Sequence, residues 1–193
     1  MIPVARPSLD EEEVEAAARV IRSGMLASGP NVAEFETAFS NYCRTAHAVA
    51  VNNGTAALHA TLLALGIGPG EEVIVPAFTF FATASAVRMC GARPVFADVD
   101  ENTFNISIDS VQECISRRTR AVIGVHLFGQ PCAIRPLLEI CGERGIPFIE
   151  DAAQAHGAVY HGKKVGGWGT AGCFSFYPTK NMTTGEGGIV TTS

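Results

Sequence analysis

Short apolar runs alternate with helix-like segments along most of this chain, and this alternation restricts its fold more than any other feature. Within a run the hydrophobic residues follow one another almost without interruption, which is typical of strands that are covered on both faces. This order predicts an α/β domain of three layers, in which helices cover both faces of a mostly parallel sheet. The expected strands span residues 48–51, 72–75, 94–97, 121–125 and 147–149, and the expected helices span 55–65, 82–90, 110–116 and 134–143.

The two ends of the chain differ from this pattern. A first helix is predicted from residue 9 to residue 23, with Ser8 and Glu11 as its capping box and Gly24 at its end. After Asp151 a glycine-rich stretch, 157–172, is followed by two further expected strands at 173–176 and 188–191. We therefore expect an N-terminal helical segment, residues 1–30, and one large domain, residues 31–193.

Charge and hydropathy place limits on the partners of the protein. The 193 residues carry a net charge of -5, and a mean hydropathy of +0.21 with 17% charged residues is typical of a folded chain. The acidic balance argues against nucleic acid as a partner, because phosphate binding needs clustered cations. One basic cluster, Arg117, Arg118 and Arg120, is interpreted as a solvated helix end.

The sequence predicts a cytoplasmic protein. The stretch from Met1 to Pro7 lacks the apolar region of a signal peptide, and no apolar run is long enough to cross a membrane. Six scattered cysteines show neither a CxxC pair nor zinc-ligand spacing, so we expect buried, reduced thiols and no metal site.

Polar residues follow the expected strands at the edge of the sheet where α/β proteins bind ligands. The segment 52–56, Asn-Asn-Gly-Thr-Ala, has the composition of an anion site at a helix N-terminus, or of an ordinary helix-capping turn. Glu150 and Asp151 leave a buried strand together. Since an unpaired buried carboxylate is costly, one of them should face a cation or a metal.

Two lysine-containing segments remain. Lys180 lies in a loop of glycine and hydroxyl residues, where a lysine on its own is normally a surface residue. Residues 157–164 match GxxxxGK, but Lys164 stands where a nucleotide-binding P-loop needs Ser or Thr for Mg²⁺. A nucleoside triphosphate site is therefore not expected there.

Together these residues fit one ligand, pyridoxal 5′-phosphate (PLP). This cofactor needs a phosphate cradle, an anion facing its ring nitrogen, a flat apolar group over its ring and a lysine at its aldehyde. Gly54, Thr55, Asp151, Phe80 and Lys180 supply these parts.

Several long motifs in the same order resemble the DegT/DnrJ/EryC1/StrS sugar aminotransferases of fold-type I PLP enzymes, from about Pro7 to Thr192. The resemblance implies the large domain of the aspartate aminotransferase-like fold, without the smaller C-terminal domain that family members carry. The motifs are NGTAAL (53–58), GIGPGEEVIVP (66–76), TF (79–80), VHLFGQP (125–131), EDAAQAHG (150–157), SFYPTKN (175–181) and TGEGG (184–188).

The resemblance also implies roles for individual residues. Lys180 would bond the cofactor and carry protons, and Asp151 would keep the ring nitrogen protonated. Gln154 would lie near the phenolic oxygen and Phe80 on the ring face. The phosphate would be held by Gly54, Thr55, Ala56 and Ser175. His126 and His156 lie within family motifs, and we expect both to be hydrogen-bonded structural residues.

The implied reaction is transamination of a nucleotide-linked keto-sugar by an amino-acid donor, with glutamate expected. A related branch has histidine in place of the lysine and dehydrates its sugar, and Lys180 favours transamination over that alternative. Members of the family are usually homodimers whose active sites lie at the subunit interface. The second alternative is a non-catalytic fragment that binds PLP weakly or not at all.

Overall fold

A computed structural model of the chain describes residues 5–193. The expectation that the N-terminus is not a signal peptide rests on Met1 to Pro7, so it lies partly outside the described residues. The helices are α1 (Glu11–Ser23), α2 (Pro30–Cys43), α3 (Gly54–Ala64), α4 (Ala82–Met89), α5 (Ile108–Cys114) and α6 (Ile134–Arg144), with a short 3₁₀ turn, η1 (Leu127–Gly129). The strands are β1 (His47–Val51), β2 (Glu72–Pro76), β3 (Arg93–Ala97), β4 (Thr119–Val125), β5 (Phe148–Asp151), β6 (Val159–Tyr160), β7 (Lys163–Lys164), β8 (Ala171–Ser175) and β9 (Gly188–Thr192).

Seven strands form one sheet in the order β1-β9-β8-β5-β4-β2-β3. Strand β9 runs antiparallel to both of its neighbours, β1 and β8, and the other pairs are parallel. The mostly parallel sheet predicted from the sequence is therefore confirmed. Every residue of the central strands β2, β5 and β8 is buried, as their uninterrupted apolar runs indicate.

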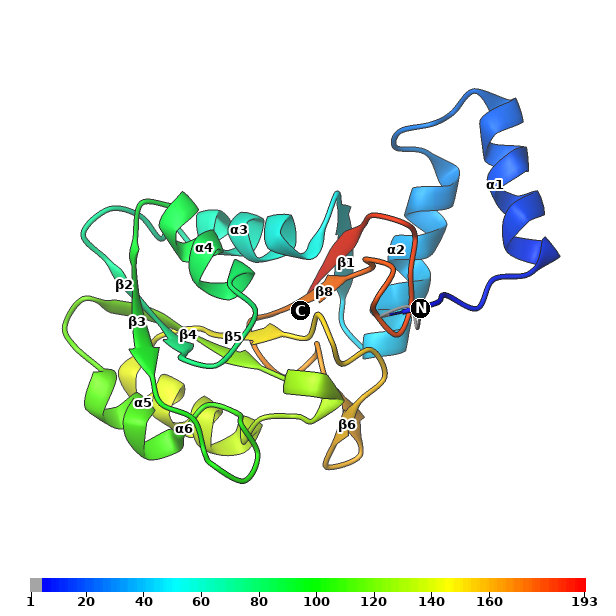
Figure 1. Cartoon of the computed structure of the whole chain (residues 1–193). Coiled ribbons are helices and arrows are strands. Elements are labelled where there is room, and N and C mark those ends of the chain that lie inside the picture. Colours follow the sequence, from blue (N-terminus) through cyan, green and yellow to red (C-terminus); the bar gives the residue numbers. More distant parts are fainter. Residues whose placement is uncertain (1–4) are drawn as a thin grey trace.

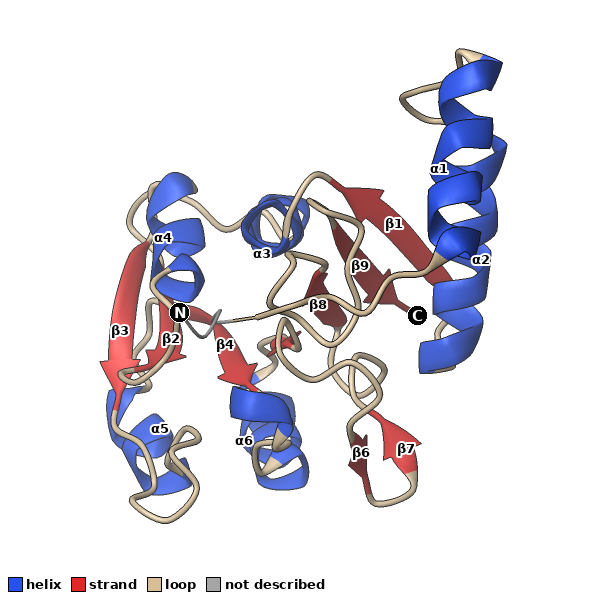
Figure 2. Ribbon diagram, turned by 45° about the vertical axis from the view of Figure 1, so that its right-hand side comes forward, coloured by secondary structure: helices blue, strands red, loops and turns tan. Residues whose placement is uncertain are grey.

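The helices form a layer on each face of the sheet (Figures 1 and 2). Helices α3 and α4 pack on one face, where Leu58, Leu62 and Val87 meet alternate strand residues such as Ile123. Helices α2, α5 and α6 supply the core of the other face. This arrangement confirms the three-layer α/β fold.

The outer strands differ from the expectation that all strands are covered. The run at 48–51 belongs to β1, an edge strand, in which 54% of Val49 is exposed. Strand β3 forms the opposite edge and leaves Phe96 56% exposed. Apolar runs alone do not distinguish an edge strand from a central one, because β-branched residues suit both positions.

The N-terminal helices correct two expectations. The capping box of α1 is formed by Asp10 and Glu13, rather than by Ser8 and Glu11, and the helix ends at Gly24 as expected. Helix α2 was not predicted. It begins at Pro30, packs on β1 and β9, and buries Phe39 and Cys43, whereas α1 buries no residue. The division of the chain at residue 30 stays a prediction.

The basic cluster is not a helix end. Arg118 and Arg120 lie just before and within β4, at the amino-terminal edge of the sheet. Arg118, together with Arg93, pairs with the buried carboxylate of Glu72 at 2.8 and 2.7 Å, and Ser116 donates to it at 2.6 Å. These bonds hold the pKa of Glu72 below its ordinary value, and the Ser116 hydroxyl contributes most.

The glycine-rich stretch contains a small hairpin. Strands β6 and β7 pair across His161 and Gly162, both of which have positive φ. The GxxxxGK match thus lies in a hairpin and not at the start of a helix, where a P-loop would lie. All six cysteines are unpaired, and only Cys114 is not fully buried. Within residues 5–193, no helix has the length and apolar character needed to cross a membrane.

Candidate active site

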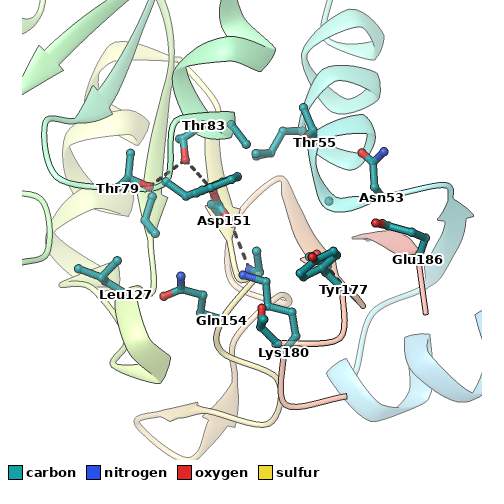
Figure 3. Close-up of a pocket in the computed structure, with 18 residues that line it drawn as sticks. Asn53, Thr55, Thr79, Thr83, Leu127, Asp151, Gln154, Tyr177, Lys180 and Glu186 are labelled. Carbon is teal, nitrogen blue, oxygen red and sulfur yellow. Dashed lines mark hydrogen bonds between the residues drawn. The ribbon is translucent and has the colours of Figure 1, made fainter. Parts of the chain in front are cut away.

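A cavity of about 490 Å³ lies at the carboxyl edge of the sheet, beside the N-termini of α3 and α4. Segments far apart in the sequence meet there, as expected for an open α/β sheet (Figure 3). The first half of the chain contributes Asn53, Gly54, Thr55, Leu58, Thr79, Phe80, Ala82 and Thr83. The second half contributes Val125, Leu127, Asp151, Ala153, Gln154, Ser175, Tyr177, Thr179, Lys180 and Glu186.

One end of the cavity has the geometry of an anion cradle. The Asn53 side chain caps α3 by accepting from the Ala56 N–H at 2.8 Å. The N–H groups of Gly54 and Thr55, in the first turn of the helix, have no intrahelical acceptor and carry the positive end of the helix dipole. Ala56 was also expected to hold phosphate, but it does not line the cavity and its N–H already has a partner.

Gly54 has a steric requirement at this position. A Cβ atom placed on Gly54 would lie 2.7 Å from the Cβ of Ser175, so a side chain would push the helix start away from β8. The Ser175 hydroxyl accepts from the Tyr177 N–H at 3.4 Å, which leaves its own proton free to donate into the cavity. The helix start and Ser175 thus form a narrow, donor-rich pocket that suits a phosphate group.

Asp151 is buried at the base of the cavity, 5% exposed. Its Oδ2 accepts from the Thr83 hydroxyl at 2.9 Å and its Oδ1 from the Ala153 N–H at 3.2 Å. Burial raises the pKa of this carboxyl, and the hydrogen bond from Thr83 is the main opposing effect. A cation bound in the cavity would relieve the cost of keeping Asp151 ionised.

Lys180 lies in the loop after β8, where its N–H donates to the Tyr177 carbonyl at 2.9 Å. Its side chain is half-buried and points into the same cavity as Asp151 (Figure 3). Burial lowers the pKa of the amine, and the charge of Asp151 opposes that shift. A lowered pKa increases the share of neutral amine, which is the nucleophilic form.

Gln154 and Phe80 occupy the side and mouth of the cavity. The Gln154 Oε1 accepts from the Phe128 N–H at 2.9 Å, which leaves its amide NH₂ as a free donor. Phe80 is 60% exposed and contacts Phe81, with ring centroids 4.4 Å apart. Both residues therefore lie where a flat ligand with a polar edge would contact them.

Glu150 points to the other face of the sheet and is completely buried. It accepts from His126 Nε2 at 3.0 Å and from the N–H groups of Gly166, Trp168 and Gly169 at 2.7–2.8 Å. Burial alone would raise its pKa, but these donors hold it below the ordinary value. Since His126 Nδ1 accepts from the Cys132 N–H at 3.2 Å, the ring carries its proton on Nε2.

The two histidines thus have different environments. His126 is a hydrogen-bonded structural residue, as expected. His156 was expected to be hydrogen-bonded as well. Among the described residues neither of its buried ring nitrogens has a partner with good hydrogen-bond geometry, although polar groups of Asn181 and Ser175 lie near enough to oppose the effect of burial on its pKa. Its ring packs against Phe174 and Phe176, with centroids 5.4 and 5.3 Å away, and burial lowers its pKa.

Sequence reasoning missed several residues that line the cavity. Among them is Thr83, whose hydroxyl donates to Asp151. It lies in the first turn of α4, just after the loop that carries Phe80. A hydroxyl residue at the start of a helix that follows a central strand is the signal that could have identified it. Among residues 5–193, no cluster of three or more His, Cys, Asp or Glu side chains could hold a metal ion.

Comparison with known proteins agrees with this geometry. The chain is 47% identical over its whole length to a GDP-perosamine synthase of Caulobacter vibrioides, of which it covers 52%. The structure matches an aminotransferase from Psychrobacter cryohalolentis with a TM-score of 0.94 at 43% identity, covering 96% of this chain and 48% of that one. It also matches the PLP-form of a Streptococcus pneumoniae protein with a TM-score of 0.96 at 34% identity, covering 100% and 53%.

The chain therefore spans about half the length of the relatives that it matches. A family model matches residues 7–193, nearly the whole sequence. Aminotransferases of this family use PLP, the ligand that the cavity residues suit. The chain belongs to the DegT/DnrJ/EryC1/StrS aminotransferase family.

Proposed function

We propose that this chain is the cofactor-binding part of a PLP-dependent aminotransferase that aminates a nucleotide-linked keto-sugar. One observation carries the proposal: a half-buried lysine, a buried carboxylate and the N-terminus of a helix open into one cavity. The cofactor requires covalent attachment, protonation of its ring nitrogen and binding of its phosphate. The lysine, the carboxylate and the helix N-terminus meet these requirements in that order.

When bound, PLP supplies an electron sink that stabilises negative charge on the substrate carbon. The chain would anchor its phosphate with the N–H groups of Gly54 and Thr55 and with the Ser175 hydroxyl. Phe80 would cover one face of the ring, and the free amide NH₂ of Gln154 would donate to the phenolic oxygen. These contacts would hold the cofactor where Asp151 could bind its ring nitrogen.

Lys180 and Asp151 would perform the proton chemistry. The Lys180 amine would hold the cofactor through its aldehyde, and its Nζ would carry a proton during the reaction. Asp151 would keep the ring nitrogen protonated, because an anion at hydrogen-bond distance favours the charged ring. A charged ring withdraws electrons more strongly than a neutral one.

The substrate class rests on the relatives. A GDP-perosamine synthase at 47% identity supports a nucleotide-linked sugar as the amino acceptor. We propose glutamate as the amino donor, and Lys180 favours transamination over dehydration. We also propose a homodimer in the cytoplasm, which the exposed Phe80, Phe81 and Phe128 near the cavity and the unpaired cysteines support.

Borohydride reduction tests the cofactor assignment. The protein incubated with PLP should turn yellow, and borohydride reduction should fix the cofactor permanently to Lys180. Lys180→Ala should prevent attachment, whereas Lys163→Arg should not. Attachment at Lys163 or Lys164 in the unsubstituted protein would overturn the assignment.

An amine-transfer assay tests the reaction. Glutamate and a panel of nucleotide-linked keto-sugars should yield 2-oxoglutarate and an amino-sugar. PLP attachment without transfer to any sugar would instead support a chain that binds the cofactor and does not complete the reaction.

A further inference from the structure

One hydroxyl group holds the Asp151 carboxylate from the side of α4. The Thr83 Oγ1 donates to Asp151 Oδ2 at 2.9 Å, and Thr83 is completely buried. The Ala153 N–H donates to the other oxygen at 3.2 Å. Each carboxylate oxygen thus has one donor from the protein, and the remaining lone pairs are available to a ligand in the cavity.

A second threonine extends this hydrogen-bonded chain, and the Asp151 acceptor sets its direction. The Thr79 and Thr83 hydroxyl oxygens are 2.9 Å apart (Figure 3). Thr83 has one hydroxyl proton, which it gives to Asp151, so its oxygen must accept from Thr79. The chain Thr79, Thr83, Asp151 therefore ends on an acceptor and stabilises the carboxylate in its ionised form.

The other titratable groups near Asp151 make different contacts from the hydrogen bond that Thr83 donates. Lys180 acts on the pKa of Asp151 through its charge, His126 binds Glu150 instead, and Cys173 is the strand partner of Asp151 across β5 and β8. Within residues 5–193, none of these side chains donates a hydrogen bond to the carboxylate. Thr83 is the side-chain donor that fixes its orientation.

We propose that Thr83 is a positioning residue, which holds Asp151 ionised and aimed at the cofactor ring nitrogen. This inference rests on the proposed function, since it concerns the partner of the PLP ring. Thr83 acts through Asp151. The absence of its hydroxyl should therefore change the protonation of the carboxyl and of the ring together.

The first test needs no cofactor. ¹³C NMR of the Asp151 carboxyl in the cofactor-free chain should show a higher pKa in Thr83→Val, which keeps the shape and removes the donor. Thr83→Ser, which restores the hydroxyl, should titrate like the unsubstituted chain. Thr61→Val is the matched control, because Thr61 is a buried threonine whose hydroxyl faces Cys173 instead. An unchanged Asp151 titration in Thr83→Val would overturn the inference.

The second test uses PLP labelled with ¹⁵N at its ring nitrogen. The chemical shift should report a protonated nitrogen in the unsubstituted protein and in Thr83→Ser, and a shift toward the neutral form in Thr83→Val. PLP affinity should fall about tenfold in Thr83→Val, as expected for a lost hydrogen bond to a charged group. Equal shifts in all variants would overturn the inference.

Two further outcomes separate the possible failures. If the unsubstituted protein leaves the ring nitrogen neutral or takes up no PLP, the proposed function is wrong, while the carboxyl titration still decides the role of Thr83. If Thr83→Val does not fold, Thr79→Val removes the donor to Thr83 at a half-buried position. It should raise the Asp151 pKa by a smaller amount, and no change would count against the chain of hydroxyls.

Discussion

Glu150 and Asp151 are adjacent in β5, yet their carboxylates lie on opposite faces of the sheet. Strand β5 extends to Asp151, so the alternation of a strand applies to both residues. Asp151 faces the cavity beside α4, and Glu150 faces the layer of α2, α5 and α6, where it binds His126 and three backbone N–H groups. Two identical functional groups therefore have separate tasks, one at the site and one in the core.

Substitutions at the two positions should change stability in opposite directions. Burial raises the pKa of Asp151 above its ordinary value of 3.8, so the ionised carboxylate destabilises the cofactor-free fold above the folded pKa. We expect Asp151→Asn to stabilise the cofactor-free chain at neutral pH, by on the order of 1 kcal/mol. The gain should vanish as the pH falls toward 3.8.

Urea unfolding of the cofactor-free chain at several pH values measures this effect. The same variant should bind PLP with a neutral ring nitrogen and lose most turnover, because a neutral ring withdraws electrons poorly. Loss of stability in Asp151→Asn would show that the ionised carboxylate contributes to the fold.

Glu150 should contribute stability that depends on pH with the opposite sign. Its folded pKa is held below the ordinary value of 4.5, so its contribution is complete above pH 4.5 and is lost as the pH falls through the folded pKa. Glu150→Gln replaces an ionic acceptor of several donors, so it should cost about 1–3 kcal/mol at pH 7. The difference from the unsubstituted chain should shrink below pH 4.5, as followed by thermal or urea unfolding. A difference that stayed constant as the pH fell from 7 to well below 4.5 would show that Glu150 is not the titrating group.

Glu72 should stabilise the sheet at the amino-terminal ends of its strands, away from the cavity, without affecting cofactor binding. Glu72→Gln removes the charge that Arg93 and Arg118 share and leaves one acceptor oxygen for three donor groups, so it should cost about 1–3 kcal/mol. Arg93→Ala should cost less, because Arg118 still pairs with the carboxylate. Unfolding curves measure the first effect, and a PLP titration should give the same affinity in all three proteins. Weaker PLP binding in Glu72→Gln would show that the two edges of the sheet are coupled.

The central part of this fold could be predicted from the sequence because the apolar runs locate the buried strands and the ends of these strands locate the site residues. Strands buried on both faces show continuous apolar runs, and ligand residues follow their carboxyl ends. Gly54, Asp151 and Lys180 follow expected strands in this way, whereas Ser175 was assigned by the resemblance to the family, and all four line the cavity.

What the sequence could not predict depends on competition between similar signals. Ser8 and Asp10 are both good N-caps followed three residues later by Glu, and the structure uses Asp10. Helix α2 was missed because Gly29 and Pro30 indicate a loop, although proline is also frequent in the first turn of a helix. The environment of His156, and the Thr83 contact to Asp151, arise from tertiary packing between distant segments, which spacing along the chain does not encode.

Gly54 offers the sharpest test of the phosphate cradle. A Cβ on Gly54 would lie 2.7 Å from the Ser175 Cβ and 3.3 Å from its Cα, so Gly54→Ala must separate the start of α3 from β8. Overpacking of this kind costs about 1–3 kcal/mol, and the same displacement would move the N–H groups that should hold the phosphate. We therefore expect lower stability and at least about tenfold weaker PLP binding.

Gly142→Ala is the matched control, since Gly142 lies in α6 with no atom within 4 Å of an added Cβ. It should leave PLP binding unchanged and increase stability by about 0.5–1 kcal/mol, because alanine has the higher helix propensity. Calorimetric titration with PLP and thermal unfolding of both variants make the comparison. If Gly54→Ala lost stability but bound PLP normally, the close approach to Ser175 would serve only packing, and the phosphate would have to bind elsewhere in the cavity.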